Sequence, residues 1–321
     1  MSTLLSIIVP AYNEEEVLEE FHRRTAAVAE QLQANEDIRT EILYVNDGSK
    51  DGTYAIMQRL CEEDERVSAI NLSRNFGKEP AMTAGFDHAK GDIVVIIDAD
   101  LQDQPELIVD MVKHWREGYD VVYAQRAERD GETFFKKATA SWFYRIIQRI
   151  SRVEIPKDTG DFRLMSRRAV DALNELREQH RFMKGLFAYV GYPQKALVYH
   201  RDARAAGETK FNYWKLWNFA LEGITSFTIA PLKIASYLGG SIAFFAFIYA
   251  LFVVAKTIIW GEPVQGYPSL MVAILFIGGV QLLFIGILGE YLGRVYNESK
   301  QRPLYYVEQY HQAKTARNKE E

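Results

Sequence analysis

Several common features are missing from the sequence, and each absence excludes a class of protein. The 321 residues include a single cysteine, Cys61, which excludes an internal disulfide framework and a cysteine-based metal site. No Gly-x-Gly-x-x-Gly motif follows the first predicted strand, and Gly77-Lys78 lacks the upstream glycine of a P-loop. Neither a dehydrogenase nor a P-loop ATPase is therefore expected. A basic, apolar, cleavable leader pattern is also absent, so we expect the N-terminal part to be cytosolic.

Concentrated positive charge is missing as well. The formal net charge is -5, and no basic stretch suggests binding to nucleic acid. Charged residues of either sign are absent from residues 234–255 and 263–289. A helix needs roughly 20 apolar residues to cross about 30 Å of hydrocarbon. We therefore predict two transmembrane helices, at approximately 234–255 and 267–289. The alternative is a pair of buried core helices, although these are usually shorter and carry a polar stripe.

The residues around these spans indicate how the chain is oriented. Basic residues lie outside the two spans, whereas the connection between them holds only Lys256 and Glu262. Cytoplasmic flanks carry the excess of Lys and Arg, so we expect a multi-pass protein of the inner (cytoplasmic) membrane with both termini in the cytoplasm. The flanking bases are Lys210, Lys215 and Lys233 before the first span and Arg294, Lys300 and Arg302 after the second.

The segment before the first span has a helical pattern. Trp214, Trp217, Leu221 and Ile224 recur at spacings of three and four, which favours an amphipathic helix in the membrane interface over a helix packed on the globular head. Glycines within the spans are consistent with close helix approach and a homo-oligomer, such as a tetramer. The expected division is a head at 1–210, a juxtamembrane helix at 211–231, a membrane segment at 232–290 and a cytosolic tail at 291–321.

The head alternates short apolar runs with amphipathic segments. Strands are predicted at 5–9, 42–45, 67–72, 93–97 and 120–123, and helices at 53–63, 79–89 and 105–117. This alternation predicts an α/β fold with a mostly parallel sheet flanked by helices. Ligands of such sheets bind beyond the carboxyl ends of the strands, where this sequence places its polar clusters.

The most informative cluster is DADLQD at 98–103. Asp98 and Asp100 directly follow an apolar strand and would repel each other unless a cation lay between them. Mg²⁺ or Mn²⁺, a hard ion with oxygen ligands, would resolve this conflict, and Gln102 is a further oxygen donor. The alternative is a solvated loop or a helix cap.

Polar residues follow the other strands too. Tyr12 and Glu14, after Pro10, offer an aromatic face and a carboxylate to a base, and Asp47 lies in an Asn-Asp-Gly-Ser turn. Asp47 has the alternative role of a turn or helix-cap residue. Arg74 and Lys78 follow the third strand, where they would contact donor phosphates or be ordinary surface cations.

Together these segments resemble family 2 glycosyltransferases, which have the GT-A fold. The resemblance rests on SIIVPAYNEE at 6–15, VNDGS at 45–49 and DADLQD at 98–103. It narrows to polyprenyl-phosphate glycosyltransferases, in particular bactoprenol (undecaprenyl-phosphate) glucosyltransferases that supply O-antigen glucosylation, with dolichol-phosphate mannose synthase as a relative. The narrower resemblance rests on SRNFGKE at 73–79, GDFRLMSR at 160–167, GETKF at 207–211 and LGEYLGR at 288–294.

The resemblance implies a role for each matching position. It implies nucleotide recognition by Pro10, Tyr12, Glu14 and Asp47, and metal and diphosphate binding by Asp98, Asp100 and Gln102. Arg126 would contact the acceptor phosphate, Asp161 would orient the acceptor or accept a proton, and Arg204 and Lys210 would bind phosphate, with Arg201 beside them. The alternative for Asp161 is a structural pair with Arg163.

The implied reaction is metal-dependent transfer of glucose from UDP-glucose to undecaprenyl phosphate, with inversion at the anomeric carbon. The Gln-x-x-Arg-Trp motif of processive synthases is absent, and the nearest stretch is QHRF at 179–182, so one sugar per acceptor is expected. Two alternatives stay open. One is the same chemistry with mannose or a modified arabinose, and the other is a non-catalytic membrane subunit that binds nucleotides.

Overall fold

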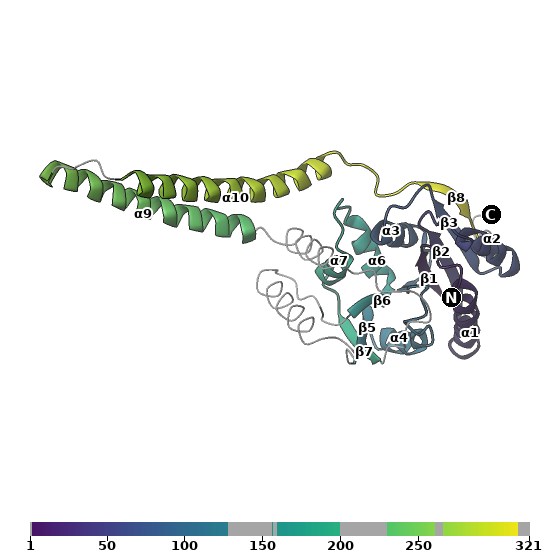
Figure 1. The fold of residues 1–321 in the computed structure, drawn as a ribbon. Helices are drawn as coiled ribbons and strands as arrows, with labels where there is room; N and C mark the ends of the chain where they lie inside the picture. The colour runs from purple at the N-terminus through teal and green to yellow at the C-terminus, as the bar shows by residue number, and fades with distance from the viewer. Residues whose placement is uncertain (1, 128–155, 157–158, 200–229, 261–265, 314–321) are drawn as a thin grey trace. The chain divides into compact units, whose positions relative to one another are not determined.

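The computed structural model describes residues 2–127, 156, 159–199, 230–260 and 266–313. The chain divides into two compact units, one of residues 1–220 with 302–321 and one of residues 221–301. The described residues of the first unit form a sheet of eight strands in the order β7-β5-β6-β4-β1-β2-β3-β8 (Figure 1). The strands are β1 (Thr3–Ala11), β2 (Ile38–Asn46), β3 (Val67–Leu72), β4 (Ile93–Ile96), β5 (Val121–Arg126), β6 (Thr159–Ser166), β7 (Gln194–Tyr199) and β8 (Val307–His311).

The sheet is mostly parallel, as predicted. Strands β1 to β4 are parallel to one another, and β5 is parallel to β7. Two antiparallel strands interrupt this pattern: β6 between β4 and β5, and β8 at the edge beside β3. The sequence predictions did not include β6, β7 or β8.

Helices cover both faces of the sheet (Figure 1). One layer holds α1, α2 and α4, which contact one another through α1, and the other holds α3, α6 and α7. Apolar side chains on both faces of the central strands, such as Ile7 and Ile8 of β1, are fully buried. Gly85 lets α3 approach β1, because a Cβ at this position would lie 2.2 Å from Ile8 Cγ2. The helices are α1 (Leu18–Glu36), α2 (Thr53–Glu63), α3 (Lys78–His88), α4 (Leu107–Arg116), α6 (Arg167–Glu175) and α7 (Met183–Tyr189).

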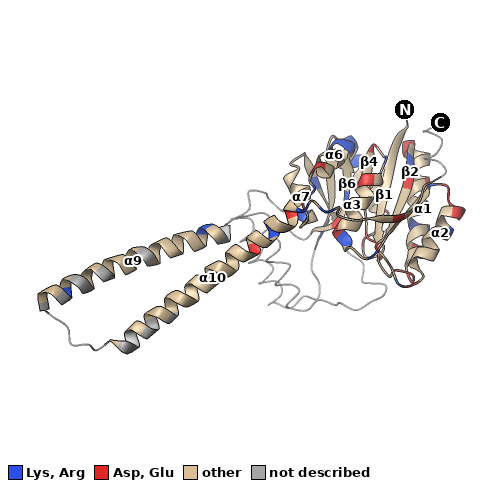
Figure 2. Cartoon of the chain, turned by 90° about the horizontal axis from the view of Figure 1, so that it is seen from above, with Lys and Arg blue, Asp and Glu red and all other residues tan. Residues whose placement is uncertain are grey.

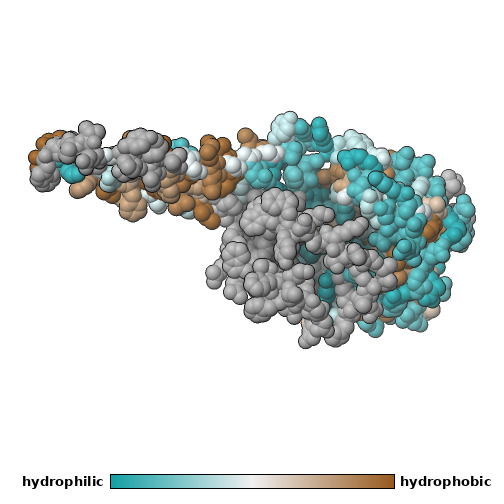
Figure 3. Space-filling view, in the orientation of Figure 1, coloured by the Kyte–Doolittle hydropathy of each residue, from teal (hydrophilic) through white to brown (hydrophobic). Residues whose placement is uncertain are grey.

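The second unit is a pair of long apolar helices, α9 (Ala230–Trp260) and α10 (Tyr267–Ser299). Both contain a stretch long and apolar enough to cross a membrane, at Leu232–Tyr249 and Phe276–Ser299. The two helices pack on each other, and a Cβ at Gly239 would lie 3.4 Å from the Phe284 ring. Hydrophobic side chains line the visible face of the pair (Figure 3), so the prediction of two long apolar helices is confirmed.

Helix α10 is longer than the apolar run that predicted it. It continues ten residues beyond position 289 to Ser299, and charged residues lie along this last part (Figure 2). Arg294 Nη2 lies 3.1 Å from Glu290 Oε1, four residues earlier. Ion pairs between residues four apart stabilise a helix. Helix α10 therefore continues to Ser299 although the apolar run ends at residue 289.

The chain after α10 returns to the sheet. No strand was predicted within residues 291–321, but β8 pairs with β3 in antiparallel register. Tyr305 Oη donates a hydrogen bond to Asp87 Oδ2 (2.8 Å), and Ala313 N–H donates to Ser68 Oγ (2.9 Å). Residues 302–313 therefore belong to the N-terminal unit.

Candidate active site

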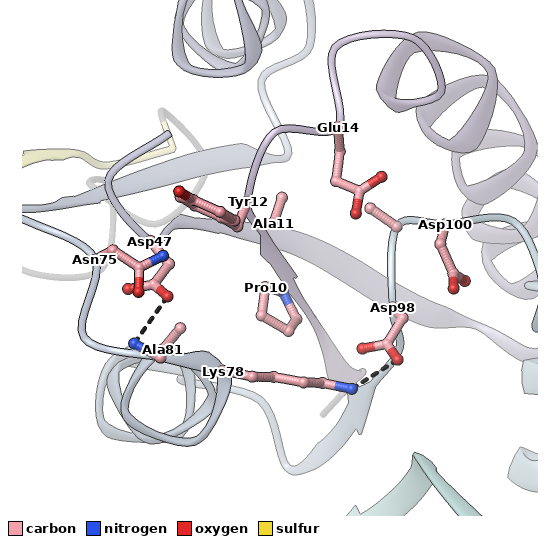
Figure 4. A pocket seen from close by; sticks show the side chains of 12 residues that line it. Pro10, Ala11, Tyr12, Glu14, Asp47, Asn75, Lys78, Ala81, Asp98 and Asp100 are labelled. Carbon is pink, nitrogen blue, oxygen red and sulfur yellow. Dashed lines mark hydrogen bonds and ion pairs between the residues drawn. The ribbon is translucent and has the colours of Figure 1, made fainter. Parts of the chain in front are cut away.

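A pocket of about 270 Å³ lies at the carboxyl ends of β1, β2 and β4 (Figure 4). Its position agrees with the rule that parallel sheets bind ligands beyond these ends. Seven of the predicted site residues line it, so most of the predicted nucleotide and metal residues lie together. They are Pro10, Tyr12, Glu14, Asp47, Lys78, Asp98 and Asp100, with Ala11, Asn75, Gly77, Ala81 and Ala99 completing the wall.

Strand β6 brings Asp161 to this pocket. Arg163 of β6 pairs with Ile96 of β4 in antiparallel register, and continuing that register by two residues places Asp161 opposite Asp98. The Lys78 ammonium lies between the two carboxylates, 2.7 Å from Asp98 Oδ2 and 2.6 Å from Asp161 Oδ2. The sequence suggested a cation between Asp98 and Asp100, whereas the structure places an ammonium between Asp98 and Asp161.

The three charges change one another's pKa values. Burial raises the pKa of Asp98 and outweighs the opposing effect of Lys78. Burial also acts to raise the pKa of Asp161, but the Lys78 ammonium, together with Lys184 and Arg163, outweighs it and holds that pKa below its usual value. Burial acts to lower the pKa of Lys78, yet the two carboxylates raise it overall. Lys78 is therefore a permanent cation at neutral pH.

Asp47 holds the loop that precedes α3. Its carboxylate accepts hydrogen bonds from Phe76 N–H (2.7 Å) and Gly77 N–H (3.0 Å), and burial raises its pKa despite these bonds. The helix after this turn, α2, has no side-chain cap at Gly52, so Asp47 is not the cap of α2. It connects the turn after β2 to the loop after β3.

Gly48 allows this connection. Its φ is +64°, and a Cβ there would lie 2.5 Å from both Arg74 C and Asn75 N. A side chain would therefore meet the backbone of the neighbouring loop, which cannot move without disturbing the amides that bind Asp47. The Asn-Asp-Gly-Ser turn thus requires glycine at its third position.

The loop after β1 is fixed by the same turn. Asn13 N–H donates to Ser49 Oγ (3.0 Å), and Lys50 N–H donates back to Asn13 Oδ1 (2.8 Å). Glu14 N–H donates to Thr53 Oγ1 (2.8 Å). These bonds set the positions of Tyr12, which is 41% exposed, and of Glu14 at the rim of the pocket.

The Asp98 and Asp100 carboxylates fit a divalent cation. Both line the pocket and supply hard oxygen ligands, and Mg²⁺ and Mn²⁺ typically complete such a set with phosphate oxygens and water. Asp100 Oδ1 accepts from Gln102 N–H (3.1 Å) across Leu101, whose φ is +58°. The Gln102 side chain is buried and does not line the pocket. No cluster of three or more His, Cys, Asp or Glu side chains suited to a metal occurs in the described part of the chain.

Arg126 lies at the end of β5, next to the start of β6. A Cβ at Gly160 would be 3.9 Å from Arg126 Nη2 and 3.8 Å from Asp103 Oδ2, so the three residues adjoin. Within the described residues, the buried Nε of Arg126 has no hydrogen-bond partner. Tyr199 donates a hydrogen bond from Oη to Asp103 Oδ1, which ties the end of β7 to this corner.

Arg163 supports Asp161 without pairing with its carboxylate. The guanidinium donates to the backbone oxygens of Asp161 (3.2 Å) and Gly160 (2.9 Å) and lies 3.6 Å from the centre of the Phe187 ring. Burial lowers the pKa of Arg163 to about 10, so it is charged at neutral pH. The carboxylate of Asp161 therefore forms its ion pair with Lys78.

Lys184 is a site residue that no sequence motif indicated. It lies on α7, where Phe187 packs against Arg163, and its side chain is half-buried. Burial lowers its pKa; Asp161 opposes this shift, whereas the nearby cations Arg163, Lys78 and Arg126 add to it. Two strands and two helices thus bring four cations close to Asp161: Arg126 of β5, Arg163 of β6, Lys78 of α3 and Lys184 of α7.

Some predicted residues lie outside the described part of the chain. They are Arg201, Arg204, Lys210, Trp214 and Trp217. The roles predicted for them, and the amphipathic helix at 211–231, stay predictions.

Two family models match the sequence. The model described as glycosyl transferase family 2 matches residues 6–173, which include every residue that lines the pocket. The model described as the GtrB C-terminal hairpin matches residues 230–295. The second match covers α9 and most of α10. Together with the length and apolar character of these helices, it indicates that the pair is membrane-associated.

Relatives match along nearly the whole chain. An uncharacterized glycosyltransferase of Synechocystis sp. is 54% identical over 307 residues, which cover 96% of this chain and 95% of that protein. The bactoprenol glucosyl transferase of Shigella phage SfV is 46% identical over 303 residues, 94% of this chain and 97% of that protein. The prophage bactoprenol glucosyl transferase homolog of Escherichia coli (strain K12) is 47% identical over 303 residues, 94% and 98% of the two chains.

Proposed function

Because the chain belongs to the family 2 glycosyltransferases, with their GT-A fold, we propose that it transfers glucose from UDP-glucose to undecaprenyl phosphate or a related polyprenyl phosphate. The observation that carries this proposal is the 46% identity to a bactoprenol glucosyl transferase over 94% of the chain. The pocket supports it, because seven of the predicted nucleotide and metal residues line one cavity. The product would be a lipid-linked sugar for O-antigen or another cell-surface glycan.

The donor would bind in the pocket described above. Tyr12 and Glu14 would contact the base, with Pro10 and Asp47 beside them, and Lys78 would bind the diphosphate by charge-assisted hydrogen bonds. Asp98 and Asp100, with Gln102 next to them, would hold Mg²⁺ or Mn²⁺, which when bound neutralises charge on the departing UDP. Arg204 and Lys210 would add positive charge to the phosphates.

The acceptor phosphate would bind on the Asp161 side of the pocket. Arg126 and Lys184 would hold the anion, and Asp161 would orient it. A phosphate monoester has a second pKa near 6, about one unit below neutral pH, so its oxygen is already a competent nucleophile. That oxygen would form a bond to the anomeric carbon as the bond from this carbon to the diphosphate breaks, with inversion and release of UDP.

The helix pair would hold the active site near its lipid substrate. Residues 234–255 and 267–289 would cross the bilayer, with the catalytic unit and both termini in the cytoplasm, because the flanking bases lie outside the spans. Trp214 and Trp217 would lie in the interface. A homo-oligomer would form through the membrane helices.

Transfer by the purified full-length protein tests this proposal. With radiolabelled UDP-glucose, undecaprenyl phosphate and Mg²⁺, we expect a labelled lipid product that disappears when the metal is removed. GDP-mannose and a UDP-linked modified arabinose test the alternative donors, and binding of nucleotide without any transfer would favour the non-catalytic alternative.

A matched pair of variants tests the metal site. Asp100→Ala is expected to reduce transfer at least ~100-fold, since charge on the leaving group is no longer compensated. Asp110→Ala removes a half-exposed carboxylate of α4 that pairs with Lys113, and it should leave transfer unchanged. Both variants should remain folded and membrane-bound. Metal-dependent turnover by Asp100→Ala at the wild-type rate would contradict the assignment.

A further inference from the structure

A chain of hydrogen bonds connects the C-terminal strand to the turn that carries Asp47. Asn71 Nδ2 donates to Glu308 Oε2 (2.9 Å), and Asn46 Nδ2 donates to Asn71 Oδ1 (2.7 Å). Ser49 N–H in turn donates to Asn46 Oδ1 (3.2 Å). Three bonds thus lead from β8 through β3 and β2 to the Asn-Asp-Gly-Ser turn.

The direction of this chain is set by Glu308. An ionised carboxylate only accepts hydrogen bonds, so it fixes the Asn71 amide with its nitrogen toward β8. The Asn71 oxygen must then face Asn46, whose own oxygen is left to accept from Ser49. Asn46 and Asn71 are both buried, where an unsatisfied amide would be costly.

Strand β8 is irregular where Glu308 lies. Asn71 pairs with Gln309 and Leu72 with Val307, so Glu308 has no partner in the register. An extra residue of this kind bends the strand and redirects a side chain. Here the Glu308 carboxylate reaches the side chain of Asn71.

A second contact from the same segment supports the other side of the pocket. Ser73 N–H donates to Tyr306 O (3.0 Å), and the Tyr306 ring lies 6.4 Å from the Phe76 ring, centre to centre. Phe76 is the residue whose N–H binds Asp47 Oδ1. Residues 306 and 308 therefore support both loops that Asp47 joins.

We propose that Glu308 and Tyr306 are positioning residues for the nucleotide-sugar pocket, acting through the turn at 46–49 and the loop at 73–77. This inference rests on the proposed function, because it assumes that the pocket binds a nucleotide sugar. Glu308 binds Asn71, and Tyr306 contacts Ser73 and Phe76, none of which lines the pocket. Their effect should therefore appear in the affinity for the donor rather than in the rate of the chemical step.

Gln309 provides a matched control on the same strand. Its Oε1 accepts a hydrogen bond from Tyr54 Oη of α2 (2.8 Å), and it pairs with Asn71 only through the register of the strands. Substitution of Gln309 thus perturbs β8 without breaking the chain of bonds to Ser49. Conservative variants at the two positions are Glu308→Gln, which keeps an acceptor oxygen, and Tyr306→Phe, which keeps the ring.

The experiment measures KM for UDP-glucose, KM for undecaprenyl phosphate and kcat with the full-length protein. Glu308→Ala and Tyr306→Leu are each expected to raise KM for UDP-glucose about three- to tenfold, the effect of losing one supporting contact. KM for the lipid and kcat should stay within about twofold of wild type. Gln309→Ala, Glu308→Gln and Tyr306→Phe should leave the donor KM near the wild-type value.

Two results would overturn the inference. One is an unchanged donor KM in both Glu308→Ala and Tyr306→Leu. The other is an equal rise in donor KM for Gln309→Ala, which would mean that any weakening of β8 has this effect. If the wild-type protein transfers no sugar, the proposed function fails, and the same variants are then compared by calorimetric binding of UDP. Equal UDP affinity across the set would reject the positioning role as well.

Discussion

Asp98 and Asp161, from neighbouring antiparallel strands, share the ammonium group of Lys78. The two N–O distances are 2.7 Å and 2.6 Å, and the Lys78 side chain remains 42% exposed. The ammonium therefore lies between two regions of the site. One contains the Asp98 and Asp100 carboxylates, and the other contains Asp161, near Arg126. Since the donor diphosphate and the acceptor phosphate must both be anionic, a permanent cation at this junction would serve both.

The first prediction concerns Lys78. Lys78→Met should reduce kcat/KM for transfer at least ~100-fold, because two carboxylates lose their shared cation and the diphosphate loses a donor. Lys78→Arg keeps the charge and should retain more activity than Lys78→Met. Steady-state kinetics of both variants provide the measurement. A kcat/KM for Lys78→Met within threefold of wild type would show that the ammonium has no part in the reaction.

The second prediction concerns Gly48. Gly48→Ala places a Cβ 2.5 Å from the backbone of residues 74 and 75, so that loop must move and its amides must shift from Asp47. We expect KM for UDP-glucose to rise more than ~10-fold. Donor titrations give this value directly.

Gly118→Ala is the control for backbone strain alone. Gly118 also has a positive φ, +100°, but a Cβ there meets nothing within 4 Å. The Gly118→Ala substitution should lower the free energy of unfolding by about 1–2 kcal/mol and leave the donor KM unchanged. If the two variants raise the donor KM equally, close packing at the turn is not the cause.

The third prediction concerns Lys184. Lys184→Met should raise KM for undecaprenyl phosphate about tenfold and leave KM for UDP-glucose unchanged, because the charge removed lies beside Asp161 and Arg126 and would face the acceptor anion. Lys195→Met removes a cation that lies over the Tyr119 ring, away from the pocket, and should change neither value. A rise in the donor KM alone would show that Lys184 contacts the donor and not the acceptor phosphate, which contradicts the prediction.

Sequence patterns within a short segment predicted those helices and strands that are defined by the segment's own residues. Helix α2 covers residues 53–63 as predicted, because its apolar residues recur on one face, and the polar clusters do lie at the ends of β1, β2 and β4. Predicted strands were shorter than the observed ones at β1 and β2, where polar or terminal residues extend a strand that is already paired.

Contacts distant in sequence escaped prediction. Strand β8 is hydrogen-bonded to β3 more than two hundred residues away, and its five residues are all exposed, so they carry no apolar pattern that would predict a strand. The pairing of Lys78 with Asp161 depends on the antiparallel direction of β6, and Arg163 interrupts the apolar residues of that strand, so no strand was predicted there. Lys184 belongs to the site only because α7 packs beside β6, and no motif surrounds it.

The last prediction concerns Asp120 and the dependence of stability on pH. Asp120, before β5, accepts hydrogen bonds from Ser166 Oγ (2.7 Å) and Arg168 Nε (2.5 Å), and its side chain is 5% exposed. The Arg168 hydrogen bond, opposed by burial, lowers the pKa of Asp120 below its usual value. A lowered folded-state pKa contributes stability that is present above the unfolded pKa, about 3.9, and is lost as the pH falls through the folded value.

Asp120→Asn should therefore be less stable than wild type at pH 7, by about 1 kcal/mol, because the neutral amide weakens the bonds from Arg168 and Ser166, and the difference should shrink below about pH 4. Thermal unfolding of both proteins between pH 3 and pH 7 measures it. Asp171→Asn is the control, because Asp171 is a 61% exposed carboxylate on α6, and its substitution should change stability little at any pH. A difference between Asp120→Asn and wild type that grows as the pH falls would have the wrong sign for a lowered pKa, and the ion pair with Arg168 would then not stabilise the junction of β5, β6 and α6.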